Sequence, residues 1–238
     1  MCGFFFISKS TSTYFRIPEK NTGTGLAKLF PNQRYPDELY KMKKRKDNSN
    51  YKADFNQALA IAVNELNVSK NEIIDALTDD NVELIEGMDK VMKYLSKDHD
   101  IIIISGSQKE KIKVYLDKFG LLDLVQDIFA QPWTITDNGR ILYTPIPTEW
   151  GGPCKITGQN ICKASILKYF VKAHGPYENL IYFGDGLNDL CPSLSLKEFD
   201  NVCPKKGSNL ESLLKEKIQS VQAQIIPWND GTDLLKYI

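Results

Sequence analysis

Residues 180–192 read Leu-Ile-Tyr-Phe-Gly-Asp-Gly-Leu-Asn-Asp-Leu-Cys-Pro, and this stretch decides the fold. Its first four residues form an apolar run that stops at Gly184, as a buried parallel strand does where it meets a loop. Glycines on both sides of Asp185 let the backbone turn sharply and present the carboxylate at the carboxyl edge of a sheet, where open α/β folds bind ligands. The stretch therefore predicts a strand that ends in a functional loop.

The polar residues of this loop predict a metal site. Asn188 and Asp189 follow Asp185 within one turn, so a chain entering a helix brings two carboxylates and an amide towards one point. Oxygen ligands of this kind suit Mg²⁺, so Asp185, Asn188 and Asp189 are the predicted metal ligands. The alternative interpretation is an ordinary strand-to-helix turn with an aspartate as N-cap, but a cap needs neither both glycines nor the second aspartate.

Composition narrows the class of partner. The 238 residues contain 30 Lys and Arg against 30 Asp and Glu, so no net charge attracts nucleic acid or an anionic membrane. We therefore expect a small-molecule partner, no nucleic acid, no membrane and no evident protein partner. The five cysteines lack the spacing of a disulfide framework, and no run approaches the roughly 20 apolar residues of a membrane span. This pattern predicts reduced thiols and a cytoplasmic protein.

The order of elements predicts an α/β fold with a doubly wound parallel sheet and a helical cap insertion. In the second half, strands and helices alternate, and a helix over 84–95 leads into four isoleucines, Ile101 to Ile104. Residues 25–95 have a helical pattern, in which Ser69 and Glu72 have the spacing of a capping box. Residues 131–160 are rich in Pro, Gly and Trp and read as an irregular loop that covers a site.

Two further side chains are expected near the aspartate loop. Ser105 follows the isoleucine strand, and Lys163 begins a predicted helix. A hydroxyl, an ammonium and a bound cation are what a phosphoryl group needs, since its transfer depends on positioning and on neutralising its oxygens. Taken singly, Ser105 is equally well a helix cap and Lys163 a surface lysine.

The order of these motifs resembles motifs two, three and four of the haloacid-dehalogenase-like phosphatases. The finer resemblance, over roughly residues 23–238, is to the phosphoethanolamine/phosphocholine phosphatase family, which also includes pyridoxal-phosphate phosphatases. It rests on four stretches, namely Gly184 to Pro192, Asn160-Ile161-Cys162-Lys163, Cys203-Pro204-Lys205-Lys206-Gly207 and Ile226-Pro227-Trp228.

The resemblance implies roles for the site. Ser105 and Lys163 would hold the phosphoryl group of a small phosphorylated metabolite, and Asp185, helped by Asp189, would hold Mg²⁺. Ser107 and Gly186 are the predicted substrate contacts. Residues 1–15 and 84–238 would form the phosphatase-like core, residues 16–83 the helical cap and residues 131–160 a second cap-like loop.

The chain departs from the family pattern at two places. The family attacks phosphorus with the first Asp of an Asp-x-Asp pair at the end of its first strand, and the second Asp is the general acid/base. In this chain Phe6 occupies the position of the nucleophile and Ser8 the position of the general acid/base. Asp54 also precedes an aromatic residue, but its helical surroundings exclude it as a substitute. After the serine, the close family carries an Asp and an Asn, whereas this chain reads Ser105-Gly106-Ser107-Gln108. Without the nucleophile no aspartyl-phosphate forms, and the cation loses one carboxylate.

Three interpretations follow. In the first, the family reaction holds for the gene, and the N-terminal residues, a Phe/Ser/Thr-rich opening, come from an alternative start, an alternative exon or a mistaken gene model. In the second, the protein is a pseudophosphatase that binds a phosphorylated ligand or a protein partner. In the third, another nucleophile such as Ser8 or Ser10 acts, although the sequence shows no base for it.

Overall fold

The structure of the chain, a computed structural model, describes six stretches of the sequence. These are residues 3–9, 15–16, 25–44, 51–77, 82–158 and 161–237, and for residues 3–9, 15–16, 25, 33, 43–44 and 51–54 it describes the backbone alone. In this part of the chain, no helix is long and apolar enough to cross a membrane.

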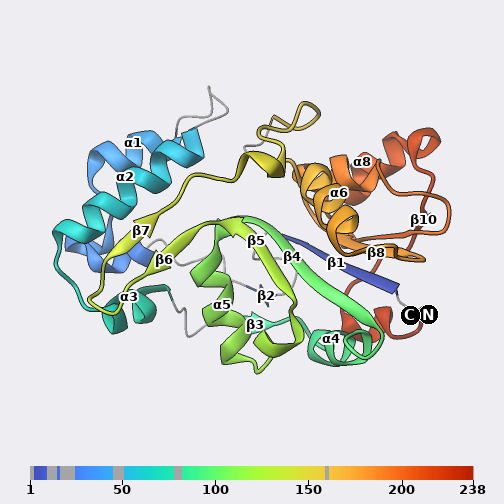
Figure 1. The fold of residues 1–238 in the computed structure, drawn as a ribbon, viewed down its shortest axis with the longest axis horizontal. Helices are drawn as coiled ribbons and strands as arrows, with labels where there is room; N and C mark the ends of the chain where they lie inside the picture. The colour runs from blue at the N-terminus through green and yellow to red at the C-terminus, as the bar shows by residue number, and fades with distance from the viewer. Residues whose placement is uncertain are drawn as a thin grey trace.

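A six-stranded sheet forms the centre of the core, in the order β10-β9-β8-β1-β4-β5 (Figure 1). Every neighbouring pair in it is parallel. Its strands are β1 (Gly3–Lys9), β4 (His99–Gln108), β5 (Asp127–Gln131), β8 (Leu180–Gly184), β9 (Asn201–Pro204) and β10 (Gln224–Ile225). The predicted α/β class with a parallel sheet is confirmed.

Helices cover both faces of this sheet, which explains the run of four isoleucines. Because side chains alternate along a strand, Ile101 and Ile103 pack on one face and Ile102 and Ile104 on the other. The helices of the first face are α4 (Met88–Leu95), α5 (Lys109–Lys118) and α9 (Gly231–Leu234). Those of the second face are α6 (Lys163–His174) and α8 (Asn209–Glu216), and Figure 1 shows α6 and α8 on the side opposite α4 and α5. The doubly wound arrangement is thus confirmed.

A separate helical unit lies beyond the far end of the sheet core. It contains α1 (Asp37–Lys44), α2 (Tyr51–Glu65) and α3 (Lys70–Leu77), with the short 3₁₀ helices η1 (Gly25–Leu29) and η2 (Pro31–Gln33). The predicted capping box is confirmed at α3, where the Glu72 backbone N–H donates to Ser69 Oγ at 3.3 Å and the Ser69 N–H donates to Glu72 Oε2 at 2.8 Å. A two-stranded sheet of β2 (Phe15–Arg16) and β3 (Glu83–Leu84) brings together the chain on either side of this unit.

A β-hairpin corrects the prediction that residues 131–160 are irregular. Strands β6 (Trp133–Ile135) and β7 (Ile141–Tyr143) pair antiparallel and extend from the sheet core towards α1–α3 (Figure 1). Trp133, Ile135 and Ile141 join the buried apolar cluster of the helical unit. The Asn64 side chain fixes the hairpin by donating to the Ile141 carbonyl at 2.9 Å and accepting from the Ile141 N–H at 2.7 Å.

The remaining elements are short. They are the 3₁₀ helices η3 (Leu122–Leu124), η4 (Thr148–Trp150), η5 (Leu187–Asp189) and η6 (Ile218–Ser220), and the helix α7 (Leu190–Ser193).

Candidate active site

The loop after β8 is built around the carboxylate of Asp189. The backbone N–H groups of Asp185 and Gly186 donate to its Oδ2 at 3.0 and 2.9 Å. A Cβ on Gly184 would lie 2.6 Å from the Asp189 Cβ, which no real structure tolerates. Gly184 is therefore needed to make room for Asp189, and the hydrogen bonds from the loop hold Asp185 at the strand end.

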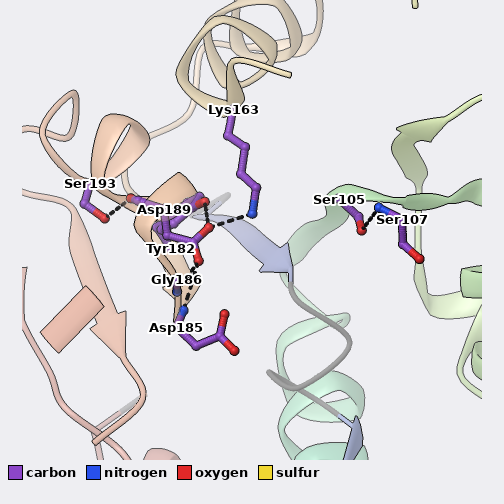
Figure 2. Close-up of polar contacts among 8 residues, drawn as sticks. All are labelled: Ser105, Ser107, Lys163, Tyr182, Asp185, Gly186, Asp189 and Ser193. Carbon is purple, nitrogen blue, oxygen red and sulfur yellow. Dashed lines mark hydrogen bonds and ion pairs between the residues drawn. The ribbon is translucent and has the colours of Figure 1, made fainter. Parts of the chain in front are cut away.

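The other oxygen of Asp189 accepts two side-chain donors. Lys163 Nζ lies 2.6 Å from Oδ1, and the Tyr182 hydroxyl donates to the same atom at 2.9 Å (Figure 2). The side chains of Lys163 and Asp189 are 1 % and 0 % exposed. The structure thus brings together Lys163, Asp185, Gly186 and Asp189, as the motif order predicts.

Lys163 is the first residue of α6, and its environment favours two opposite states. Burial lowers the pKa of its ammonium below the usual value, while the neighbouring carboxylates of Asp189 and Asp185 favour the charged form and oppose that shift. A further negative group beside Lys163, such as a phosphate, would favour the charged ammonium form more strongly.

Ser105 lies on β4, which is longer than the sequence predicts. We expected the strand to end at Ile104, but β4 continues to Gln108 with an irregular register between Ile104 and Gln108. The Ser105 side chain is buried, and its Oγ accepts the Ser107 N–H at 2.9 Å. The irregular strand end thus folds the backbone of Ser107 back over the Ser105 hydroxyl.

The two halves of the site lie on opposite sides of β1. Figure 2 shows Ser105 and Ser107 on one side of this strand and Lys163, Asp185 and Asp189 on the other. This follows from the sheet order, in which β1 lies between β8 and β4. The residue at the end of β1 therefore stands between the two groups.

The backbone register gives the level of each residue in β1. Phe6 pairs with Ile102 and Tyr182, whereas Ser8 pairs with Ile104 and Lys9 with Ser105. Phe6 is thus three residues before the level of Ser105. The side chains of Phe6 and Ser8 lie outside the described residues, so their assignment to the nucleophile and acid positions stays a prediction.

The loop contains oxygen atoms that could bind a hard cation, but the predicted metal ligands are not equivalent. Asp189 already accepts four hydrogen bonds, two on each carboxylate oxygen. The Asp185 carboxylate and the Asn188 amide oxygen, at the strand end, are oxygen ligands of the kind that Mg²⁺ prefers. These ligands therefore fit a cation held through Asp185, with Asp189 organising the loop behind it.

Three residues of this region make contacts that the sequence did not predict. Tyr182 read as one of four apolar strand residues, and its hydroxyl gave no separate signal. Gln108 Nε2 donates to Asn56 Oδ1 of α2 at 3.3 Å and so links the end of β4 to the helical unit. A contact between residues 52 positions apart leaves no trace in local sequence patterns.

A cavity of about 1060 Å³ lies beside α6 and is separate from this constellation. Its described lining includes Lys168, Tyr177 and Asp200, and does not include Ser105, Lys163, Asp185 or Asp189.

Comparison with known proteins places the chain in a family. The profile of the family described as "Putative Phosphatase" matches residues 16–238. The phosphoethanolamine/phosphocholine phosphatase of Gallus gallus is 29 % identical over 170 residues, which are 67 % of this chain and 62 % of that protein. The pyridoxal phosphate phosphatase of Homo sapiens is 25 % identical over 232 residues, covering 93 % and 92 %.

The extent of these alignments differs between relatives. The chain spans 62 % of the Gallus gallus protein and 57 % of a probable phosphatase from Danio rerio, which is less than two thirds of either. Solved structures agree on the fold. A phospho-aspartyl intermediate analogue of phosphoserine phosphatase has a TM-score of 0.56 at 18 % identity, covering 100 % of this chain and 99 % of that one.

A second structure, cytosolic 5′-nucleotidase IIIB bound to cytidine, has a TM-score of 0.55 at 12 % identity, covering 98 % and 83 %. Together with the parallel sheet and the aspartate loop, the profile match shows that the chain belongs to this phosphatase family, within the haloacid-dehalogenase-like fold.

Proposed function

We propose that the site binds the phosphoryl group of a small phosphorylated metabolite, with Lys163 and Ser105 as its protein ligands and a Mg²⁺ ion held through Asp185. The buried ion pair of Lys163 and Asp189, which lies directly behind Asp185 at the carboxyl edge of the sheet, supports this proposal most strongly. Burying the Lys163–Asp189 pair costs desolvation free energy, and this cost is explained if the pair positions the Lys163 ammonium for an anionic ligand.

Each residue has a distinct task in this proposal. Lys163 supplies positive charge to the phosphoryl oxygens, and Ser105 supplies a hydroxyl from the other side of β1. Asp189 is a positioning residue, because it holds the Lys163 ammonium and the backbone of Asp185 and Gly186 together. Mg²⁺, when bound, would neutralise charge on the phosphoryl group and orient it.

We further propose that hydrolysis needs a carboxylate that β1 of this chain does not provide. Family members form the covalent intermediate on an aspartate at the end of this strand, but the nine residues up to Lys9 contain no Asp or Glu. A serine hydroxyl needs a general base to attack phosphorus. The chain with Phe6 and Ser8 is thus expected to bind phosphate esters and to turn them over weakly or not at all.

The helical unit and the hairpin are proposed to cover the site. The hydrogen bond from Gln108 to Asn56 joins the strand end that carries Ser105 to α2 of that unit. A cover that closes over phosphate restricts the ligand to a small metabolite. The curated relatives act on phosphoethanolamine, phosphocholine and pyridoxal phosphate by their names, so these three esters are the first to test.

The test separates binding from catalysis. Thermal stabilisation and hydrolysis are measured with each ester, with and without Mg²⁺. A ligand present at 100 times its dissociation constant adds about 2.7 kcal/mol of stability. Asp185→Asn should abolish the Mg²⁺-dependent part of the stabilisation. The matched control is Asp123→Asn, which removes an exposed carboxylate from η3, just before β5 at the amino edge of the sheet.

The double substitution Phe6→Asp with Ser8→Asp tests the catalytic part. If the remaining site is intact, Mg²⁺-dependent turnover should appear or rise by orders of magnitude, and it should vanish again when Asp185→Asn is added. Ester binding without any gain of turnover would show that the nucleophile belongs elsewhere on β1. Failure of all three esters and of inorganic phosphate to stabilise the protein would overturn the proposed function.

A further inference from the structure

Three cysteines from separate parts of the chain bring their sulfur atoms together. Cys154 lies in the loop after η4, Cys162 precedes α6 and Cys191 lies in α7. Their Sγ atoms all lie within 4.8 Å of one another, and those of Cys162 and Cys191 are 3.8 Å apart. The three residues are 3 %, 8 % and 8 % exposed, and all three are free thiols.

The spacing fits a metal site and does not fit a disulfide. A disulfide joins sulfurs at about 2.05 Å, and it pairs two thiols and leaves the third over. In a tetrahedral zinc site with Zn–S bonds of about 2.3 Å, neighbouring sulfurs are about 3.8 Å apart. The observed separation of Cys162 and Cys191 has this value, and the third sulfur lies close enough to complete a triangle.

The loop that carries Cys154 is a closed turn. The Gly158 N–H donates to the Cys154 carbonyl at 2.8 Å, so the backbone holds this thiol in place beside the other two.

The three sulfur atoms leave a fourth ligand position on the metal, which a ligand from solvent can reach through a cavity. Cys154, Cys162 and Cys191 all line the cavity of about 1060 Å³ beside α6. Three protein ligands with an open fourth position is a common arrangement for zinc in proteins.

We propose that Cys154, Cys162 and Cys191 bind one zinc-type cation as thiolates, with water or a small solute as the fourth ligand. Binding releases the thiol protons to solvent. The site is distinct from the oxygen-ligand site of Asp185, because sulfur selects a softer cation than Mg²⁺.

The position of this three-cysteine site suggests what the metal stabilises. Cys162 is adjacent to Lys163, and Cys191 is two residues after Asp189. A cation held by all three thiolates would fix the start of α6 and the start of α7 to each other and would tie the loop of residues 151–158 to both. The two residues of the buried ion pair would thus be carried on a cross-linked backbone.

The experiment uses the full chain, reduced and freed of metal by a chelator. Cd²⁺ is titrated in while the ultraviolet thiolate-to-cadmium charge-transfer absorption is followed, and Zn²⁺ is then added in competition. We expect saturation at one Cd²⁺ per chain and displacement by Zn²⁺. Cys154→Ser, Cys162→Ser and Cys191→Ser should each reduce the absorption and weaken metal affinity at least tenfold, whereas Cys203→Ala, a buried cysteine outside the cluster, should leave both unchanged.

A second measurement uses no substituted variant, so its result does not depend on whether a variant folds. The unsubstituted chain is treated with a thiol-alkylating reagent with and without Zn²⁺, and the labelled peptides are identified by mass. Zn²⁺ should slow the labelling of all three cluster cysteines together. Absence of charge-transfer absorption, unchanged labelling with Zn²⁺, or a Cys162–Cys191 disulfide in the natively isolated protein without bound metal would each overturn the proposal.

Discussion

The Lys163 ammonium lies 2.6 Å from the Asp189 carboxylate, and both side chains are almost entirely excluded from water. An ion pair in such a place gains little net stability, because desolvation of two charges offsets their attraction. The pair instead fixes the geometry of the site, since the Asp189 carboxylate also accepts hydrogen bonds from the N–H groups of the loop that carries Asp185. Removing either charge leaves the other buried.

We therefore expect Asp189→Asn to lower the free energy of unfolding by about 3–5 kcal/mol, because it leaves the Lys163 charge without its partner. Urea unfolding of the single variants and of Lys163→Met with Asp189→Asn measures the coupling. The double variant should lose less than the sum of the two single losses. Asp137→Asn is the matched control, since its pair with Lys70 is nearly as short at 2.7 Å but exposed to solvent, and it should change stability little. Additive losses would show that the buried pair is not an interacting unit.

Gly184→Ala should disturb the site although it adds a single methyl group. The new Cβ would lie 2.6 Å from the Asp189 Cβ, so the backbone or the ion pair must move, at a cost of about 1–3 kcal/mol. Gly186→Ala is the comparison, because its Cβ would meet the end of the flexible Asn188 side chain at 2.9 Å. Thermal unfolding should rank Gly184→Ala as the more damaging change, and the reverse order would contradict the described packing.

The bond between Gln108 and Asn56 predicts energetic coupling between the strand end and the helical unit. Gln108→Ala leaves the buried side-chain oxygen of Asn56 without this donor, which should lower the free energy of unfolding by about 1–3 kcal/mol. A double-mutant cycle with Asn56→Ala should return a coupling of about 1 kcal/mol. A coupling energy near zero would mean that this hydrogen bond does not couple the strand end to the helical unit.

His99 predicts a loss of stability in mild acid. Burial lowers the pKa of its imidazole below the usual value, against the opposing influence of the Leu95 backbone and the carboxylates of Asp98 and Asp100. The unfolded chain therefore binds the proton more readily, and stability should fall as the pH drops below about 6.5. His99→Gln should flatten the difference in unfolding free energy between pH 7 and pH 5, and an NMR titration should place the His99 pKa below 6.5. A pKa above 6.5 would reverse the sign.

Local patterns were sufficient to predict most of the sheet core. Four consecutive isoleucines indicate a strand buried on both faces, and Ile101 to Ile104 do divide between two apolar clusters. The Ser69–Glu72 spacing correctly predicted a capping box, and Lys163 was correctly expected at a helix start. These signals extend over a few neighbouring residues, so a single sequence contains them in full.

Features that depend on distant partners were not predictable. The strands of the β6–β7 hairpin have three residues each, too few for alternation to be visible, and their apolar residues pack against helices encoded about 70 positions earlier. Asp189 was predicted as a metal ligand by its spacing, but the occupation of both its oxygens depends on Tyr182 and Lys163 as well as on the loop. Which donors reach a carboxylate is decided by the assembled fold.

The hairpin also sets an order of events during synthesis of the chain. The apolar cluster of the helical unit needs Trp133, Ile135 and Ile141, and Asn64 needs the backbone of Ile141 to satisfy its amide. When residue 77 leaves the ribosome, α1–α3 therefore still expose part of their apolar surface. The unit can close only after residues 133–143 have emerged, by which time β4 and β5 of the sheet core are already available. Folding of the helical unit is thus tied in time to that of the core, and a chain interrupted before the hairpin would expose the apolar cluster of this unit.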